Sequence, residues 1–73
     1  MVRLYRALMN TGATMKIETR SEFNGIIFTF WYGGKNHKTV HSFESVERCP
    51  DLIVDMLSVE LVKFVTYVNS HNA

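Results

Sequence analysis

Residues 15–32, MKIETRSEFNGIIFTFWY, decide the fold of this chain, because an Asn-Gly pair stands between two stretches with strand-like alternation. Asn24 and Gly25 suit the two central positions of a type I′ turn, where both residues need a positive φ. A two-residue turn at this point predicts an antiparallel hairpin in which Phe23 pairs with Ile26.

The two faces of this hairpin differ in character. One face carries Ile26, Phe28 and Phe30, and we expect it to face the core. The other face mixes Trp31 and other uncharged residues with charges from the first strand, so it is expected to face water or a partner. In the expected register Glu18 lies opposite Trp31.

A second turn at Gly33-Gly34-Lys35-Asn36 predicts that residues 37–43 return as a third strand. The favoured register pairs Tyr32 with His37 and Trp31 with Lys38. The side chains that this register places on the core face are His37, Thr39, His41 and Phe43. A slip of one residue would place Val40 there instead.

The last third of the chain has helical patterning. Residues 43–48 suit one short helical turn with Ser42 or Ser45 as its cap, and Pro50 suits the first turn of the next helix. From Leu52 the apolar residues follow helical spacing over about 17 residues. The alternative is a break near Ser58 that gives two shorter helices.

The sequence therefore predicts one α+β domain over residues 1–73: an antiparallel three-stranded meander with a long C-terminal α-helix packed on one face. Residues 2–9 fit either a helix or a strand, and as a strand they would be the fourth of the sheet. Because Met15 could serve as an initiator, residues 1–14 can also be an N-terminal extension. Residues 70–73 are expected to be a frayed tail.

A chain of 8.4 kDa has little core to stabilise it, and its single cysteine cannot form an internal disulfide. Three valines, Val54, Val59 and Val62, fall outside the apolar stripe of the long helix. Burial of these valines against a second copy predicts a homodimer through the helix.

Charge is divided along the chain. Residues 1–43 contain six Lys and Arg residues and two Glu residues, a net charge of +4, whereas residues 44–73 carry a net charge of −3. Such a distribution favours self-association as well as binding of an anionic ligand.

Trp31 is the first candidate for a partner-binding residue, because an exposed tryptophan offers a large rigid surface with little entropy to lose. The residues expected around it on the charged face complete the predicted site: Arg20, Lys38, Ile27 and Glu18. In the alternative interpretation the N-terminal segment covers Trp31 through Leu4, Tyr5 and Leu8.

No catalytic residue, metal site or cofactor is predicted. On a strand, His37 and His41 would lie about 13 Å apart, too far to share a metal ion. Cys49 lacks an accompanying oxyanion or orienting motif, and a lone cysteine in a small domain is more often a buried apolar residue. Asp51 and Asp55 are interpreted as part of a solvated helix face.

These features favour a non-catalytic protein-interaction module, a small regulator or inhibitor that docks on a larger macromolecule. Such small proteins are frequent in phages and mobile elements, and that origin is part of the hypothesis. The alternative is a small nucleic-acid-binding protein that uses the basic and aromatic sheet face. The longest apolar run, residues 26–31, is too short to span a bilayer, and one unpaired cysteine suggests the cytoplasm.

Overall fold

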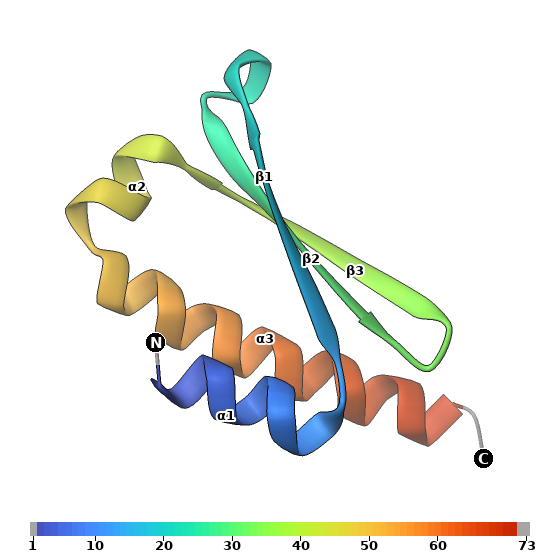
Figure 1. Cartoon of the computed structure of the whole chain (residues 1–73). Helices are drawn as coiled ribbons and strands as arrows, with labels where there is room; N and C mark the ends of the chain where they lie inside the picture. The colour runs from blue at the N-terminus through green and yellow to red at the C-terminus, as the bar shows by residue number, and fades with distance from the viewer. Residues whose placement is uncertain (1, 72–73) are drawn as a thin grey trace.

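A three-stranded antiparallel sheet forms one layer of the molecule, and two helices lie side by side on the same side of it (Figure 1). The computed structural model describes residues 2–71. The elements are α1 (Val2–Thr11), β1 (Thr14–Arg20), the 3₁₀ turn η1 (Ser21–Phe23), β2 (Gly25–Tyr32), β3 (Lys35–Ser42), α2 (Phe43–Arg48) and α3 (Pro50–His71). The predicted α+β class, with a three-stranded meander and a long C-terminal helix, is confirmed.

The connection between β1 and β2 is longer than the predicted two-residue turn. Asn24 alone takes the left-handed conformation, with φ 48° and ψ 41°, and its backbone N–H donates to the carbonyl of Ser21. Gly25 already belongs to β2, where a Cβ atom would meet the carbonyl oxygen of His41 at 2.8 Å. This glycine is therefore required for close approach to β3, and Phe23, expected to pair with Ile26, lies exposed in the turn.

The register of β1 on β2 differs by four residues from the expected one, so Thr19 pairs with Ile26. Because side chains alternate with a period of two, an even shift leaves every side chain on its predicted face. The same holds for β3, which shifts by two residues because Gly33 and Gly34, both at positive φ, form the tight turn. Tyr32 consequently pairs with Lys35 and not with His37.

Residues 2–11 form helix α1 and not a fourth strand. A helix brings Leu4 and Leu8 to one side, where they pack with residues of α3. Its last residue, Thr11, donates its hydroxyl to the carbonyl of Ala7 at 2.7 Å, and Gly12 follows at φ 76°. The N-terminal residues thus contribute directly to the core through Leu4, which is buried.

The predicted helical turn after β3 is present as α2, and Ser42 is its N-cap: the Ser42 hydroxyl accepts a hydrogen bond from the Ser45 N–H at 3.0 Å. Helix α3 is continuous, without the break considered near Ser58. The Ser58 hydroxyl donates to the carbonyl of Val54 at 2.9 Å, so this buried polar group is satisfied inside the helix. The helix extends to His71, past the beginning of the expected tail. Residues 72 and 73 lie outside the described residues.

The core lies between the helices and one face of the sheet. Phe28 and Phe30 supply the sheet side, as predicted, and Leu57 and Leu61 supply the helix side. The η1 end of the sheet extends beyond α1 and α3 (Figure 1). Ile17, in the middle of the edge strand β1, is exposed although its register places it on the core face.

Candidate functional site on the helix-free face of the sheet

Within residues 2–71, no second layer covers the face of the sheet opposite the helices (Figure 1). We call it the outer face. The strand registers assign to it Thr14, Lys16, Glu18 and Arg20 of β1, Gly25, Ile27, Thr29 and Trp31 of β2, and Asn36, Lys38, Val40 and Ser42 of β3.

The predicted partner-binding residues, Trp31, Arg20, Lys38, Ile27 and Glu18, all belong to this one face. Their pairing differs from the expected one. Trp31 lies opposite Thr14 and Asn36, whereas Glu18 lies opposite Ile27. The alternative in which the N-terminal segment covers Trp31 does not hold, because Leu4 packs in the core on the other side of the sheet.

Thr29 marks the centre of the outer face. It is only 1% exposed, although no helix covers this side of the sheet. Its cross-strand neighbours are Lys16 and Lys38, and its neighbours along the strand are Ile27 and Trp31. These four side chains are the ones positioned to close over Thr29. Trp31 is therefore next, on the same face of β2, to a closely packed residue.

Apolar side chains remain accessible around this centre. Trp31 is 40% exposed and Val40 is 53% exposed, while Ile27, which lies opposite Val40, is half-buried. A rigid aromatic residue with aliphatic neighbours is the usual composition of a protein-binding hot spot.

Some charged residues of the outer face lie close to an opposite charge, and others do not. Glu18 lies 3.9 Å from both Lys16 and Arg20, and Arg20 also lies 3.6 Å from Glu22. Lys38 on β3 forms no ion pair within residues 2–71. The β1 side of the outer face is thus a mixed-charge surface, whereas the β3 side keeps a positive charge.

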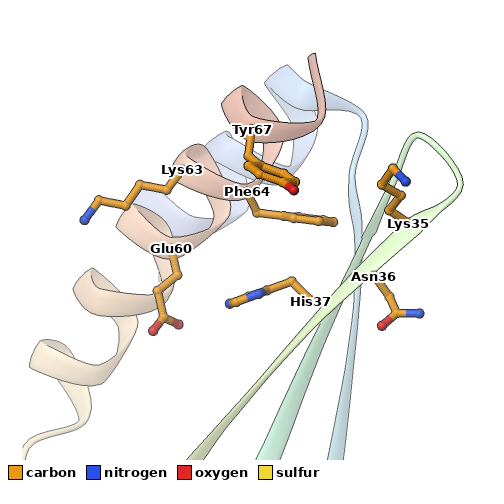
Figure 2. Close-up of a pocket in the computed structure, with 7 residues that line it drawn as sticks. All are labelled: Lys35, Asn36, His37, Glu60, Lys63, Phe64 and Tyr67. Atoms are coloured by element: carbon orange, nitrogen blue, oxygen red, sulfur yellow. The ribbon is translucent and has the colours of Figure 1, made fainter. Parts of the chain in front are cut away.

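A pocket of about 580 Å³ opens at the edge of β3, between this strand and α3 (Figure 2). We call it the β3 pocket; its lining residues are Lys35, Asn36, His37, Glu60, Lys63, Phe64 and Tyr67. The His37 ring stacks on Phe64 with centroids 5.6 Å apart. One carboxylate oxygen of Glu60, Oε2, is buried without a hydrogen-bond partner among the described residues.

The three valines proposed for a dimer interface do not share one environment. Val54 is half-buried and packs against the core. Val59 and Val62 are about half exposed, at 51% and 50%. They line a shallow groove between α1 and α3 together with Arg3 and Ala7.

Cys49 is exposed, so its interpretation as a buried apolar residue is wrong. It ends α2 at the junction with α3, where its carbonyl accepts the Ile53 N–H and its side chain is left in solvent. Asp51 and Asp55 are exposed as expected, and Asp55 lies 3.5 Å from Arg3 of α1.

Among residues 2–71, no cluster of histidine, cysteine and carboxylate side chains has an arrangement that could hold a metal ion. No helix in that range is both long and apolar enough to cross a membrane.

Sequence reasoning identified Trp31 and its charged neighbours but missed Thr29 and Glu60. The alternation that placed Trp31 also places Thr29 on the outer face, yet burial of Thr29 depends on cross-strand neighbours. Glu60 had no signal in the sequence, because its position beside His37 depends on how α3 crosses the sheet.

Comparisons of the chain with protein-family models, with curated proteins and with solved structures find no match. The function is therefore inferred from the outer face and its surroundings.

Proposed function

We propose that this protein is a non-catalytic interaction module, a small regulator or inhibitor that docks on a larger protein through the outer face of its sheet. The observation that carries the proposal is the state of Trp31: 40% exposed, on a face without a second layer, beside the closely packed Thr29. A large aromatic side chain with few rotatable bonds loses little entropy on binding, so its burial can contribute much of the affinity.

The size of the exposed apolar surface also supports a partner. The accessible surface is 5149 Å², whereas a folded monomer of 8.4 kDa is expected to expose about 4,600 Å². Among residues 3–71, twelve large hydrophobic residues are exposed, and both layers contribute to them. A second contact, between copies of the chain through Val59 and Val62 of α3, forms part of the proposal.

Binding of nucleic acid through the same face is the alternative. Lys16, Arg20 and Lys38 could contact phosphates while Trp31 stacks on a base. Glu18, however, lies within 3.9 Å of both Lys16 and Arg20, so it opposes phosphate binding on the β1 side. This charge pattern favours a protein partner.

The proposal places the module in the cytoplasm, because the one cysteine of the chain, Cys49, is a free and exposed thiol. Exposed unpaired thiols persist in a reducing compartment. A phage or mobile-element origin remains a hypothesis that rests on the small size of the chain.

Affinity capture tests the proposal. Tagged wild-type protein, Trp31→Ala and Tyr5→Ala are immobilised and exposed to lysate of the source cell, with and without nuclease. Tyr5 is the matched control, because it is an aromatic residue of the helical layer and 64% exposed. We expect wild type and Tyr5→Ala to retain the same protein, and Trp31→Ala to lose it.

The purified partner is then titrated against the emission of Trp31, the only tryptophan of the chain. Binding should shift this emission to shorter wavelength. Calorimetry, which needs no tryptophan, measures Trp31→Ala, and this variant should bind more weakly by a factor of about 30, the loss of about 2 kcal/mol that defines a hot spot. Equal retention by Trp31→Ala would exclude the outer face as the binding site. Loss of capture after nuclease treatment would favour the nucleic-acid alternative.

A further inference from the structure

Strand β3 is an edge of the sheet, since the strand order is β1-β2-β3. In the described part of the chain no strand lies beside its outward backbone groups, and six of its eight residues are exposed. An unpaired edge of this kind can take up an extended peptide as an additional strand. The residues of such a peptide would point alternately to the outer face and to the helix side.

On each of these two sides, the β3 edge adjoins a surface that could accept a side chain of the peptide: the outer face on one side and the β3 pocket on the other. Asn36 lies opposite Trp31 on the outer face, and Asn36 also lines the β3 pocket on the helix side. The outer face and the pocket therefore meet at this strand, as Figure 2 shows for Asn36 and His37, which project to opposite sides of β3. A peptide paired with β3 would reach both with successive side chains.

The β3 pocket has a specific chemical requirement. Glu60 Oε2 is buried and lacks a hydrogen-bond donor among residues 2–71. The aromatic rings of His37 and Phe64 stack beside it, whereas Lys63 extends away from the other lining side chains (Figure 2). An arginine or lysine side chain would supply N–H donors to Glu60 and stack its stem or guanidinium on the rings.

The outer side of the edge has the opposite requirement. The register places Lys38 on this side, whereas Lys35 lines the β3 pocket; strand β3 has no carboxylate, and neither lysine forms an ion pair within residues 2–71. A residue of the incoming strand opposite Lys38 would be favoured if it were acidic. The edge of β1 differs, because Lys16 and Arg20 already lie near Glu18.

We infer that β3 binds an extended segment of the partner protein by strand addition, with an acidic side chain beside Lys38 on the outer face and a basic side chain in the β3 pocket at Glu60. This inference rests on the proposed function and specifies how the partner is recognised. A second copy of β3 is a poor occupant, because two strands with lysines and no carboxylates would repel each other.

A library of random twelve-residue peptides, displayed on phage, provides the test. Selection against the purified protein should enrich sequences in which acidic residues alternate with residues that include Arg or Lys. A synthetic peptide of the selected sequence should protect amides of β3 from hydrogen exchange and change the emission of Trp31. The same peptide with alternate backbone nitrogens methylated should not bind, because it can no longer pair along the strand.

Two variants and a control examine the outer face and the β3 pocket separately. Lys38→Glu should weaken binding of the selected peptide about tenfold. Glu60→Gln should remove the advantage of the basic residue over alanine at that peptide position. Arg6→Glu, which reverses an exposed charge on α1, is the control and should leave binding unchanged.

The inference is overturned if selection yields no alternating peptide, or if the bound peptide leaves β3 exchange unchanged. It is equally overturned if selections on wild type and on Glu60→Gln both enrich acidic residues at the peptide position that enters the pocket. The proposed function fails differently: it fails when Trp31→Ala captures the same partner as wild type, whatever the exchange of β3. If Trp31→Ala loses the partner but the partner does not protect the amides of β3, the proposed function stands and strand addition is excluded.

Discussion

At the scale of single residues, the buried hydroxyl of Thr29 lowers the stability of the free protein. Its Oγ1 is buried and has no hydrogen-bond partner among residues 2–71. A buried hydroxyl without a partner lowers stability by about 1–3 kcal/mol. The side chain lies at the centre of the outer face, on the same face of β2 as Trp31.

Replacement of Thr29 by valine should therefore stabilise the protein. Valine has the same shape but no polar oxygen to desolvate, so we expect the free energy of unfolding to rise by about 1 kcal/mol. Urea denaturation followed by circular dichroism measures the change. The control is Thr19→Val on exposed β1, which should stay within about 0.5 kcal/mol of wild type. A destabilised Thr29→Val protein would show that Oγ1 has a bonding partner in solution.

Asn24 and Gly25 show the limits of residue-level prediction. Their sequence correctly indicates a reversal of the chain, because Asn tolerates a positive φ. It does not reveal that Gly25 is needed for another reason, the close approach of the His41 carbonyl oxygen. That contact joins residues far apart in the chain, so a local turn rule cannot detect it.

At the scale of elements, α3 provides most of the helical core. Its buried residues recur at helical spacing, among them Leu57 and Leu61, which are 1% and 0% exposed. Leu52, in the first turns of the same helix, is 57% exposed. The helix therefore contains identical side chains in opposite environments.

Leu61→Ala should destabilise the protein by about 2–5 kcal/mol, because it removes buried apolar surface and leaves a cavity. A domain of this length has a total stability of about 4–11 kcal/mol, so the variant should unfold at much lower urea concentration. Leu52→Ala is the matched control and should cost less than about 0.5 kcal/mol. Similar losses in both variants would contradict the packing of α3.

The sheet shows how an element can be predicted correctly from a wrong register. Both predicted registers were displaced, by four and by two residues, yet Phe28 and Trp31 lie on the faces that the alternation assigned to them. An even displacement preserves the faces, whereas the cross-strand partners of each residue change. The residues of the candidate site were therefore predictable, but their pairings were not.

At the scale of the whole molecule, two layers only 15 Å deep along the shortest axis leave little interior. Val59 and Val62 remain half exposed on α3, in the shallow groove between α3 and α1. Self-association through this surface would remove them from water and stabilise the fold by mass action.

Sedimentation equilibrium at micromolar concentration should thus give a mass near twice 8.4 kDa. The double variant Val59→Glu/Val62→Glu should be monomeric, because it places charges in the contact. Val40→Glu changes an equally exposed valine in the other layer and should remain dimeric. A wild-type protein that sediments at 8.4 kDa would rule out the helix-mediated dimer.

The sequence by itself determined the α+β class, the three strands, the long helix and the two faces of the sheet. Each of these follows from periods of two or 3.6 residues that are local to an element. The residues of the outer face were accessible to the same reasoning, because parity along a strand survives errors in its turns.

Only the tertiary structure decided that residues 2–11 form a helix against α3, that Thr29 is closed over, and that Glu60 lies beside His37 at the edge of β3. Residues 2–9 have a pattern that fits either a helix or a strand, so they take the conformation that their packing partners favour. Burial and pocket geometry arise from contacts between distant segments, and for this reason no local pattern in the chain predicts them.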